Sequence, residues 1–127
     1  MDAASAPAVR PLILLVEDDG SVREALTFAL KIEGYDIEVF EDAEALLALA
    51  ELPKPACLVL DHYLPGMTGI EALAALRARG LVCPALLITT QPKGDVRAAA
   101  ARLGARLLEK PLLGDVLPAA IRDILGG

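Results

Sequence analysis

Five short apolar segments recur along the chain, and amphipathic segments separate them. The apolar segments cover residues 12–16, 35–40, 56–60, 85–89 and 105–109. Four of them are continuous or nearly so, which is typical of parallel strands covered on both faces, whereas residues 35–40 alternate as an edge strand does. The pattern therefore predicts five β-strands.

The intervening segments carry apolar residues at helical spacing and have recognisable helix ends. Helices are expected over residues 21–34, 42–51, 68–80, 95–104 and 115–125. Asp42 suits the N-cap of the second helix, and Thr68 with Glu71 has the spacing of a capping box. Gly34 and Gly80 stand where the first and third helices would end.

Regular alternation of strand and helix predicts an α/β domain with a parallel sheet and right-handed crossovers. No repeat, linker or low-complexity segment interrupts the alternation. Residues 1–11, which are rich in small residues and proline, are expected to be a flexible tail, and residues 12–127 one domain. Sheets of this kind bind ligands beyond the carboxyl ends of their strands, so functional residues are sought there.

Composition narrows the classes of function. The chain has 127 residues, 55% of them hydrophobic, which suffices for one substantial core. A net charge of −6, no basic block and 3% aromatic residues argue against direct nucleic-acid binding. No run approaches the roughly 20 apolar residues of a membrane span. Cys57 and Cys83 lack metal-ligand spacing and are expected to be buried thiols in a reducing cytoplasm.

Chemically active residues cluster where the predicted strands end. Three acids follow the first strand, namely Glu17, Asp18 and Asp19. Asp61 follows the third strand and Lys110 the fifth, while the fourth ends in the hydroxyls of Thr89 and Thr90. One helix cap explains one acid, but three adjacent carboxylates repel one another unless a cation lies among them. The set suits Mg²⁺ and a phosphoryl group, with a carboxylate as nucleophile.

Four motifs occur in order on these elements: LVEDD after the first strand, LDHYLPGMTG after the third, ITT after the fourth and EKP after the fifth. Together they resemble the receiver domain of two-component response regulators, over nearly the whole chain from about Leu12. The resemblance implies a flavodoxin-like, doubly wound, five-stranded parallel sheet of order 2-1-3-4-5 with helices on both faces.

The resemblance also implies a role for each site residue. Asp61 corresponds to the phosphoacceptor, Lys110 to the phosphoryl-binding lysine, and Thr89 to the switch hydroxyl. These three form the catalytic set. The Mg²⁺ ligands would be Glu17, Asp18, Asp61 and the backbone carbonyl of Tyr63. Pro111, after the lysine, is expected to follow a cis peptide bond.

Two assignments have alternatives. The acidic pair could be Asp18 and Asp19, but Arg23, five residues after Asp18, favours Glu17 and Asp18. Asp19 would then begin the loop or cap the helix. Thr90 is a secondary candidate that lines the entrance to the site.

Two other positions carry expectations about the surroundings of the site. His62 is expected to be an exposed loop residue and not a ligand, because no second His or Cys accompanies it. Leu107 stands three residues before the lysine, where many members of the family carry an aromatic residue that couples to the switch hydroxyl. Output would then depend on backbone or helix movement.

The implied function is a bacterial, cytoplasmic switch. A sensor histidine kinase or histidine phosphotransfer protein would phosphorylate Asp61 in a Mg²⁺-dependent reaction, and the change would alter a surface of the fourth and fifth helices and the fifth strand. An output protein or effector domain, or a second copy in a homodimer, would bind there. Phosphotransfer and dephosphorylation would be self-catalysed, and no small-molecule enzyme is expected because Tyr63 replaces a second acid. The alternative is a phosphorylation-independent docking module on the same fold.

Overall fold

The computed structural model describes residues 10–126, and its five strands form one parallel sheet of order β2-β1-β3-β4-β5. The strands are β1 (Leu12–Val16), β2 (Asp36–Phe40), β3 (Cys57–Asp61), β4 (Ala85–Thr89) and β5 (Ala105–Glu109). The helices are α1 (Gly20–Ile32), α2 (Ala43–Leu47), α3 (Gly69–Ala78), α4 (Gly94–Arg102) and α5 (Val116–Ile124). Every expected strand and helix is present. Residues 1–9 of the expected tail lie outside the described part of the chain.

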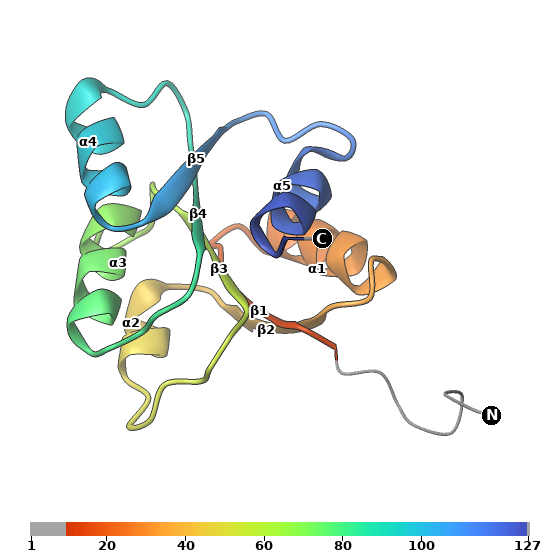
Figure 1. The fold of residues 1–127 in the computed structure, drawn as a ribbon, viewed down its shortest axis with the longest axis horizontal. Coiled ribbons are helices and arrows are strands. Elements are labelled where there is room, and N and C mark those ends of the chain that lie inside the picture. Colours follow the sequence, from red (N-terminus) through yellow and green to blue (C-terminus); the bar gives the residue numbers. More distant parts are fainter. Residues whose placement is uncertain (1–9, 127) are drawn as a thin grey trace.

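The helices cover both faces of the sheet. Figure 1 shows α1 and α5 against one face, and α2, α3 and α4 against the other. Because β2 and β3 lie on opposite sides of β1, the connections that leave β1 and β3 diverge at the carboxyl edge of the sheet. That divergence is the switch point at which doubly wound sheets form a ligand crevice.

Two apolar cores form because successive strand residues point to opposite faces. Ile13 and Leu15 of β1 pack with Leu30 of α1 on one face, while Leu14 packs with Leu73 of α3 on the other. All residues of β3 and β4 are buried. Their continuous apolar sequences are therefore explained by coverage on both faces.

The two thiols belong to the core, as predicted. Cys57 and Cys83 are both buried and free. Burial raises the pKa of the Cys57 thiol to about 12, and it also raises that of Cys83. Both side chains therefore remain neutral at physiological pH and act as small apolar groups.

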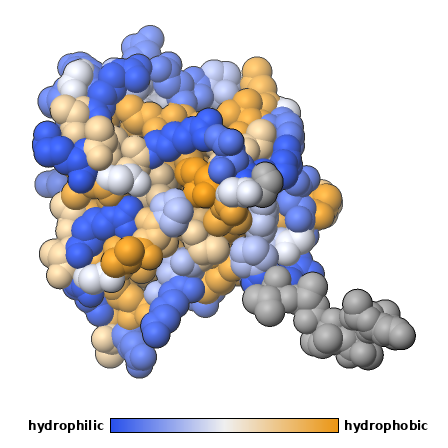
Figure 2. Space-filling model, in the orientation of Figure 1, coloured by the Kyte–Doolittle hydropathy of each residue, from blue (hydrophilic) through white to orange (hydrophobic). Residues whose placement is uncertain are grey.

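The predicted helix caps are present. The Val22 N–H donates to Asp19 and the Ala45 N–H to Asp42, while Thr68 and Glu71 form the reciprocal capping box. Within residues 10–126, none of the helices has the length and apolar character needed to cross a membrane. On the face in Figure 2, polar and apolar side chains are interleaved in small groups.

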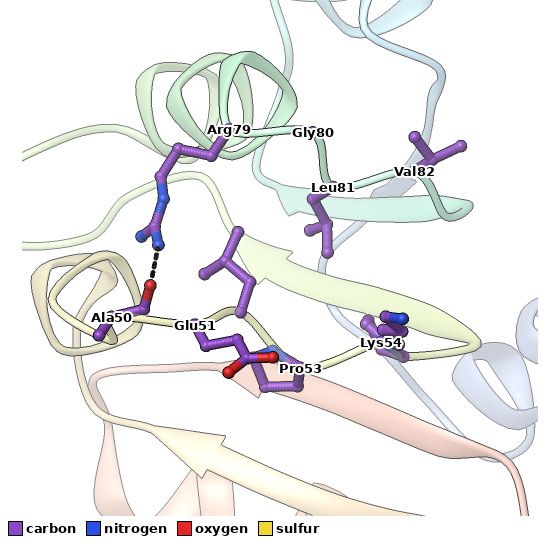
Figure 3. Close-up of a pocket in the computed structure, with 10 residues that line it drawn as sticks. Ala50, Glu51, Pro53, Lys54, Arg79, Gly80, Leu81 and Val82 are labelled. Atoms are coloured by element: carbon purple, nitrogen blue, oxygen red, sulfur yellow. Dashed lines mark hydrogen bonds between the residues drawn. The ribbon is translucent and has the colours of Figure 1, made fainter.

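Helix α2 is shorter than its sequence predicts and ends at Leu47 instead of near residue 51. The Arg79 guanidinium, from the end of α3, donates to the carbonyls of Leu47 and Leu49 at 2.8 Å and of Ala50 at 3.3 Å. These bonds satisfy carbonyl groups at the helix end. Figure 3 shows Arg79 reaching Ala50 across a pocket of about 510 Å³ at the amino edge of the sheet.

Strand β5 lies at one edge of the sheet, as the expected strand order requires, and apolar residues pack on both of its faces, Leu108 on the α5 side and Leu107 on the α4 side. Arg106 and Glu109 of β5 are exposed. Arg106 pairs with Asp123 of α5 at 2.6 Å, and Glu109 with Arg97 of α4 at 3.0 Å. The charged residues of β5 therefore link this edge strand to both neighbouring helices.

Candidate functional site

Three carboxylates meet at the carboxyl edge of the sheet. The pairing of Val16 with Leu60 brings the ends of β1 and β3 together. One carboxylate oxygen from each of Glu17, Asp18 and Asp61 lies within 4.8 Å of the others. Glu17 and Asp61 are each 3% exposed, whereas Asp18 is exposed. Such a group concentrates negative charge that a cation would offset.

Asp19 does not belong to this cluster. Its Oδ1 accepts a hydrogen bond of 3.0 Å from the Val22 N–H, so its side chain caps α1. Its own N–H donates to Glu17 Oε2 at 3.0 Å, and Arg23 donates to the Glu17 carbonyl at 2.9 Å. Asp19 and Arg23 therefore hold Glu17 in place. Asp19 is the N-cap residue of α1, which is one of the two roles expected of it.

Both oxygens of Asp61 are hydrogen-bonded. The Lys110 ammonium donates to Oδ2 at 2.9 Å, and the Tyr63 N–H donates to Oδ1 at 3.1 Å. The Lys110 N–H donates to the Thr89 carbonyl at 2.8 Å, which fixes the start of the loop after β5. The Lys110–Pro111 peptide is cis, as expected. In the strand order β1 lies on one side of β3 and β5 on the other, so Glu17 and Asp18 approach Asp61 from one side and Lys110 from the other.

The site brings three carboxylates together with one ammonium, so the pKa values of its groups are shifted. Burial raises the pKa of Glu17 to about 7, the Asp19 N–H opposes this rise, and the charge of Asp61 adds to it. Burial would lower the pKa of Lys110, but the hydrogen bond and charge of Asp61 outweigh it and raise that pKa. A bound cation would therefore relieve a real repulsion.

The raised pKa of Glu17 predicts a stability penalty that grows as pH rises from about 4.5 to about 7, because the fold disfavours the charged carboxylate. Glu17→Gln removes that charge. Without divalent metal, the variant is expected to exceed the native chain in unfolding free energy by on the order of 2 kcal/mol at pH 8, and to match it near pH 4. Urea denaturation with a chelator at both pH values measures this. Glu24→Gln, on the exposed side of α1, is the control, and a difference that does not change with pH would contradict the prediction.

The donor set fits Mg²⁺. This ion takes oxygen ligands, keeps several waters, and is commonly held by one or two carboxylates with a phosphoryl group. The three converging carboxylates supply such oxygens, and Glu17 is held by two neighbouring hydrogen bonds. Tyr63 lies in the loop that follows Asp61, and the role of its carbonyl as a ligand stays a prediction.

The two threonines lie differently. Thr89 is 0% exposed, and its Oγ1 makes no hydrogen bond to any residue that the structure describes. Thr90 is exposed and lines a groove of about 580 Å³ with Glu17 and Lys110, between α1 and the loop after β5. The groove therefore reaches Glu17 and Lys110 from outside.

The expectation that His62 is exposed is wrong, because only 7% of it is accessible. Strand β3 extends through Asp61, so the next side chain turns to the other face of the sheet. There it lines a pocket of about 250 Å³ with Thr68, at the start of α3, and Asp95 of α4. Continuing the alternation of Leu58 and Leu60 by two residues would have revealed this burial.

Comparisons with known proteins agree with this geometry. The family model described as "Response regulator receiver domain" matches residues 13–122. The transcriptional regulatory protein FixJ of Bradyrhizobium diazoefficiens is 33% identical over 114 residues, which are 89% of this chain and 56% of that protein. The response regulator MprA of Mycobacterium leprae is 36% identical over 89% of this chain and 50% of its own length. The chain thus spans about half the length of these relatives.

Solved structures show the same fold. The chemotaxis protein CheY4 of Vibrio cholerae has a TM-score of 0.83 at 26% identity, covering 91% of this chain and 99% of that one. Full-length FixJ from B. japonicum has a TM-score of 0.81 at 34% identity, covering 94% of this chain and 59% of that one. The sheet is the flavodoxin-like one that the sequence predicted. The chain therefore belongs to the receiver domain family of response regulators.

Proposed function

We propose that this receiver domain accepts a phosphoryl group on Asp61, in a Mg²⁺-dependent reaction, from a histidine of a sensor kinase or of a histidine phosphotransfer protein. The observation that carries the proposal is the position of the Asp61 carboxylate, which Lys110 contacts at 2.9 Å beside two further acids. Lys110 and one of these acids, Glu17, line an open groove. Phosphoryl transfer needs chiefly a positioned nucleophile and positive charge.

In the proposed reaction, an Asp61 oxygen forms a bond to phosphorus while the bond between phosphorus and the donor histidine nitrogen breaks. Lys110 turns from the carboxylate oxygen to a phosphoryl oxygen and offsets its charge. Glu17, Asp18, Asp61 and the Tyr63 carbonyl would hold Mg²⁺, which supplies further positive charge when bound. The Thr89 hydroxyl donates a hydrogen bond to a phosphoryl oxygen. Water later hydrolyses the acyl phosphate, so phosphotransfer and dephosphorylation are both self-catalysed and the chain acts as a switch.

The output surface in this proposal is formed by α4, β5 and α5. Two ion pairs cross it, Arg97 to Glu109 and Arg106 to Asp123, so β5 is tied to both helices. Movement of Thr89 at the end of β4 would change how these elements pack and shift the population of the binding-competent surface. An output protein, an effector domain or a second copy of the chain would bind there, in the bacterial cytoplasm.

The test is phosphorylation of the native chain by acetyl phosphate, followed by intact mass. A gain of one phosphoryl group with Mg²⁺, lost with a chelator, is expected. No gain by the folded chain with Mg²⁺, from acetyl phosphate or from a panel of phosphorylated histidine phosphotransfer proteins, would overturn the proposal. That result would favour the phosphorylation-independent docking module.

A further inference from the structure

Two buried polar atoms near the site have no hydrogen-bond partner among the residues that the structure describes, His62 Nδ1 and Thr89 Oγ1. His62 is only 7% exposed, and Thr89 is fully buried. Buried polar groups nearly always have a partner, because an unsatisfied one costs free energy. Each of these two atoms is therefore expected to have a hydrogen-bond partner.

The two residues are neighbours on adjacent strands. Asp61 pairs with Ile88 at the end of the β3 and β4 ladder, and the His62 N–H donates to the Ile88 carbonyl at 2.8 Å. Continuing the register by one residue sets His62 opposite Thr89. Adjacent strands lie roughly 4.8 Å apart, so the two backbones are within reach of each other's side chains.

Both side chains also lie on the same face of the sheet. Leu60 and Leu87 belong to the core cluster that faces α3 and α4. Residues two positions further along each strand share that face, and these are His62 and Thr89. His62 indeed lines the pocket between α3 and α4. The two unpartnered atoms therefore occupy one layer beneath α4.

We propose that His62 Nδ1 is the resting partner of the Thr89 hydroxyl, and that His62 is a positioning residue for the switch. A neutral imidazole with its proton on Nε2 accepts at Nδ1, and a threonine hydroxyl donates, so each atom satisfies the other after a side-chain rotation. The inference rests on the proposed function. The Thr89 hydroxyl would leave His62 when it turns to a phosphoryl group on Asp61, so His62 opposes the switch.

The position of the imidazole gives this exchange a route to the output surface. The His62 ring lies edge-on to the Tyr63 ring, with centroids 5.1 Å apart, and it shares its pocket with Asp95 and Val96 in the first turns of α4. A change of partner at Nδ1 therefore acts directly beneath α4. In this chain the route through His62 takes the place of the aromatic coupling to the switch hydroxyl, which Leu107 cannot provide.

The test measures the affinity of the magnesium-loaded chain for beryllofluoride, a phosphoryl analogue, by titration. His62→Phe keeps a planar ring but removes the acceptor, so the Thr89 hydroxyl no longer has to leave a partner. The variant is expected to bind beryllofluoride about fivefold more tightly, the effect of one net hydrogen bond. His62→Asn keeps an acceptor at the position of Nδ1 and is expected to stay near the native affinity. His62→Leu repeats the test without a ring.

A second background separates a hydrogen bond from a packing effect. Thr89→Val keeps the shape of the threonine and removes its hydroxyl, so His62→Phe added to it is expected to change the affinity no further. Equal effects of His62→Phe in both backgrounds, or native affinity for both the Phe and Leu variants, would overturn the inference and leave the proposed function standing. Failure of the native chain to bind beryllofluoride would instead overturn the proposed function, and with it the inference.

Discussion

Replacement of Asp61 by asparagine is expected to abolish phosphorylation by acetyl phosphate and to leave the fold intact. The amide has nearly the shape of the carboxylate but no anionic oxygen to attack phosphorus. It also removes one charge from a crowded acidic cluster, in which Asp61 is only 3% exposed. Lys110 loses its partner, but its side chain is 38% exposed and can be hydrated. Intact mass over a time course with Mg²⁺ measures the loss, and a thermal unfolding curve checks the fold.

The matched control is Asp42→Asn. This residue caps α2 through its side-chain oxygen, a role that asparagine also performs, and it does not belong to the acidic cluster. Asp42→Asn is expected to gain a phosphoryl group at the native rate. Continued phosphorylation of Asp61→Asn would show that another residue is the acceptor, and peptide mapping would then identify it.

Replacement of Lys110 by methionine is expected to slow phosphorylation of Asp61 by on the order of 100-fold, comparable to the loss of one preorganised donor at a charged transition state. Methionine keeps much of the length of the side chain but cannot donate to a phosphoryl oxygen. Lys110 is the ammonium that contacts the Asp61 carboxylate, at 2.9 Å. The initial rate of phosphoryl gain at saturating Mg²⁺ measures the effect.

Lys54→Met is the control for charge and composition. Lys54 is exposed and lines the pocket before β3, at the amino edge of the sheet and away from the acidic cluster. Its replacement makes the same change in net charge and is expected to leave the rate unchanged. If both variants kept the native rate, Lys110 would be an ordinary partner of Asp61 in the resting fold and not a participant in transfer.

The excess of acids at the site makes sense as a functional arrangement. A carboxylate whose pKa burial raises to about 7 weakens the fold when it ionises, so ionised Glu17 does not stabilise the fold. The pH dependence expected of Glu17→Gln and the phosphorylation tests therefore examine the same cluster from two sides. The first measures how far the charges destabilise the fold without metal. The second measures how far they contribute to phosphorylation.

Much of the fold was readable from local patterns. Continuous apolar runs specified β1, β3 and β4, because both faces of these strands are covered. Asp42 and the Thr68 and Glu71 pair marked helix starts, since capping depends on residues within one turn. The position of functional side chains at strand ends also followed from the sequence, because parallel strands end at one edge of the sheet.

The tertiary structure decided what depends on distant partners. Helix α2 ends early with Arg79 bonded to its terminal carbonyls from about 30 positions away. His62 is buried because β3 continues to Asp61 and α4 covers the next position. The sequence by itself determined the elements, their caps and the residues at the strand ends, because these follow from local spacing. Where α2 stops was decided only by tertiary contacts, because it depends on the Arg79 guanidinium, which folding brings to the end of the helix.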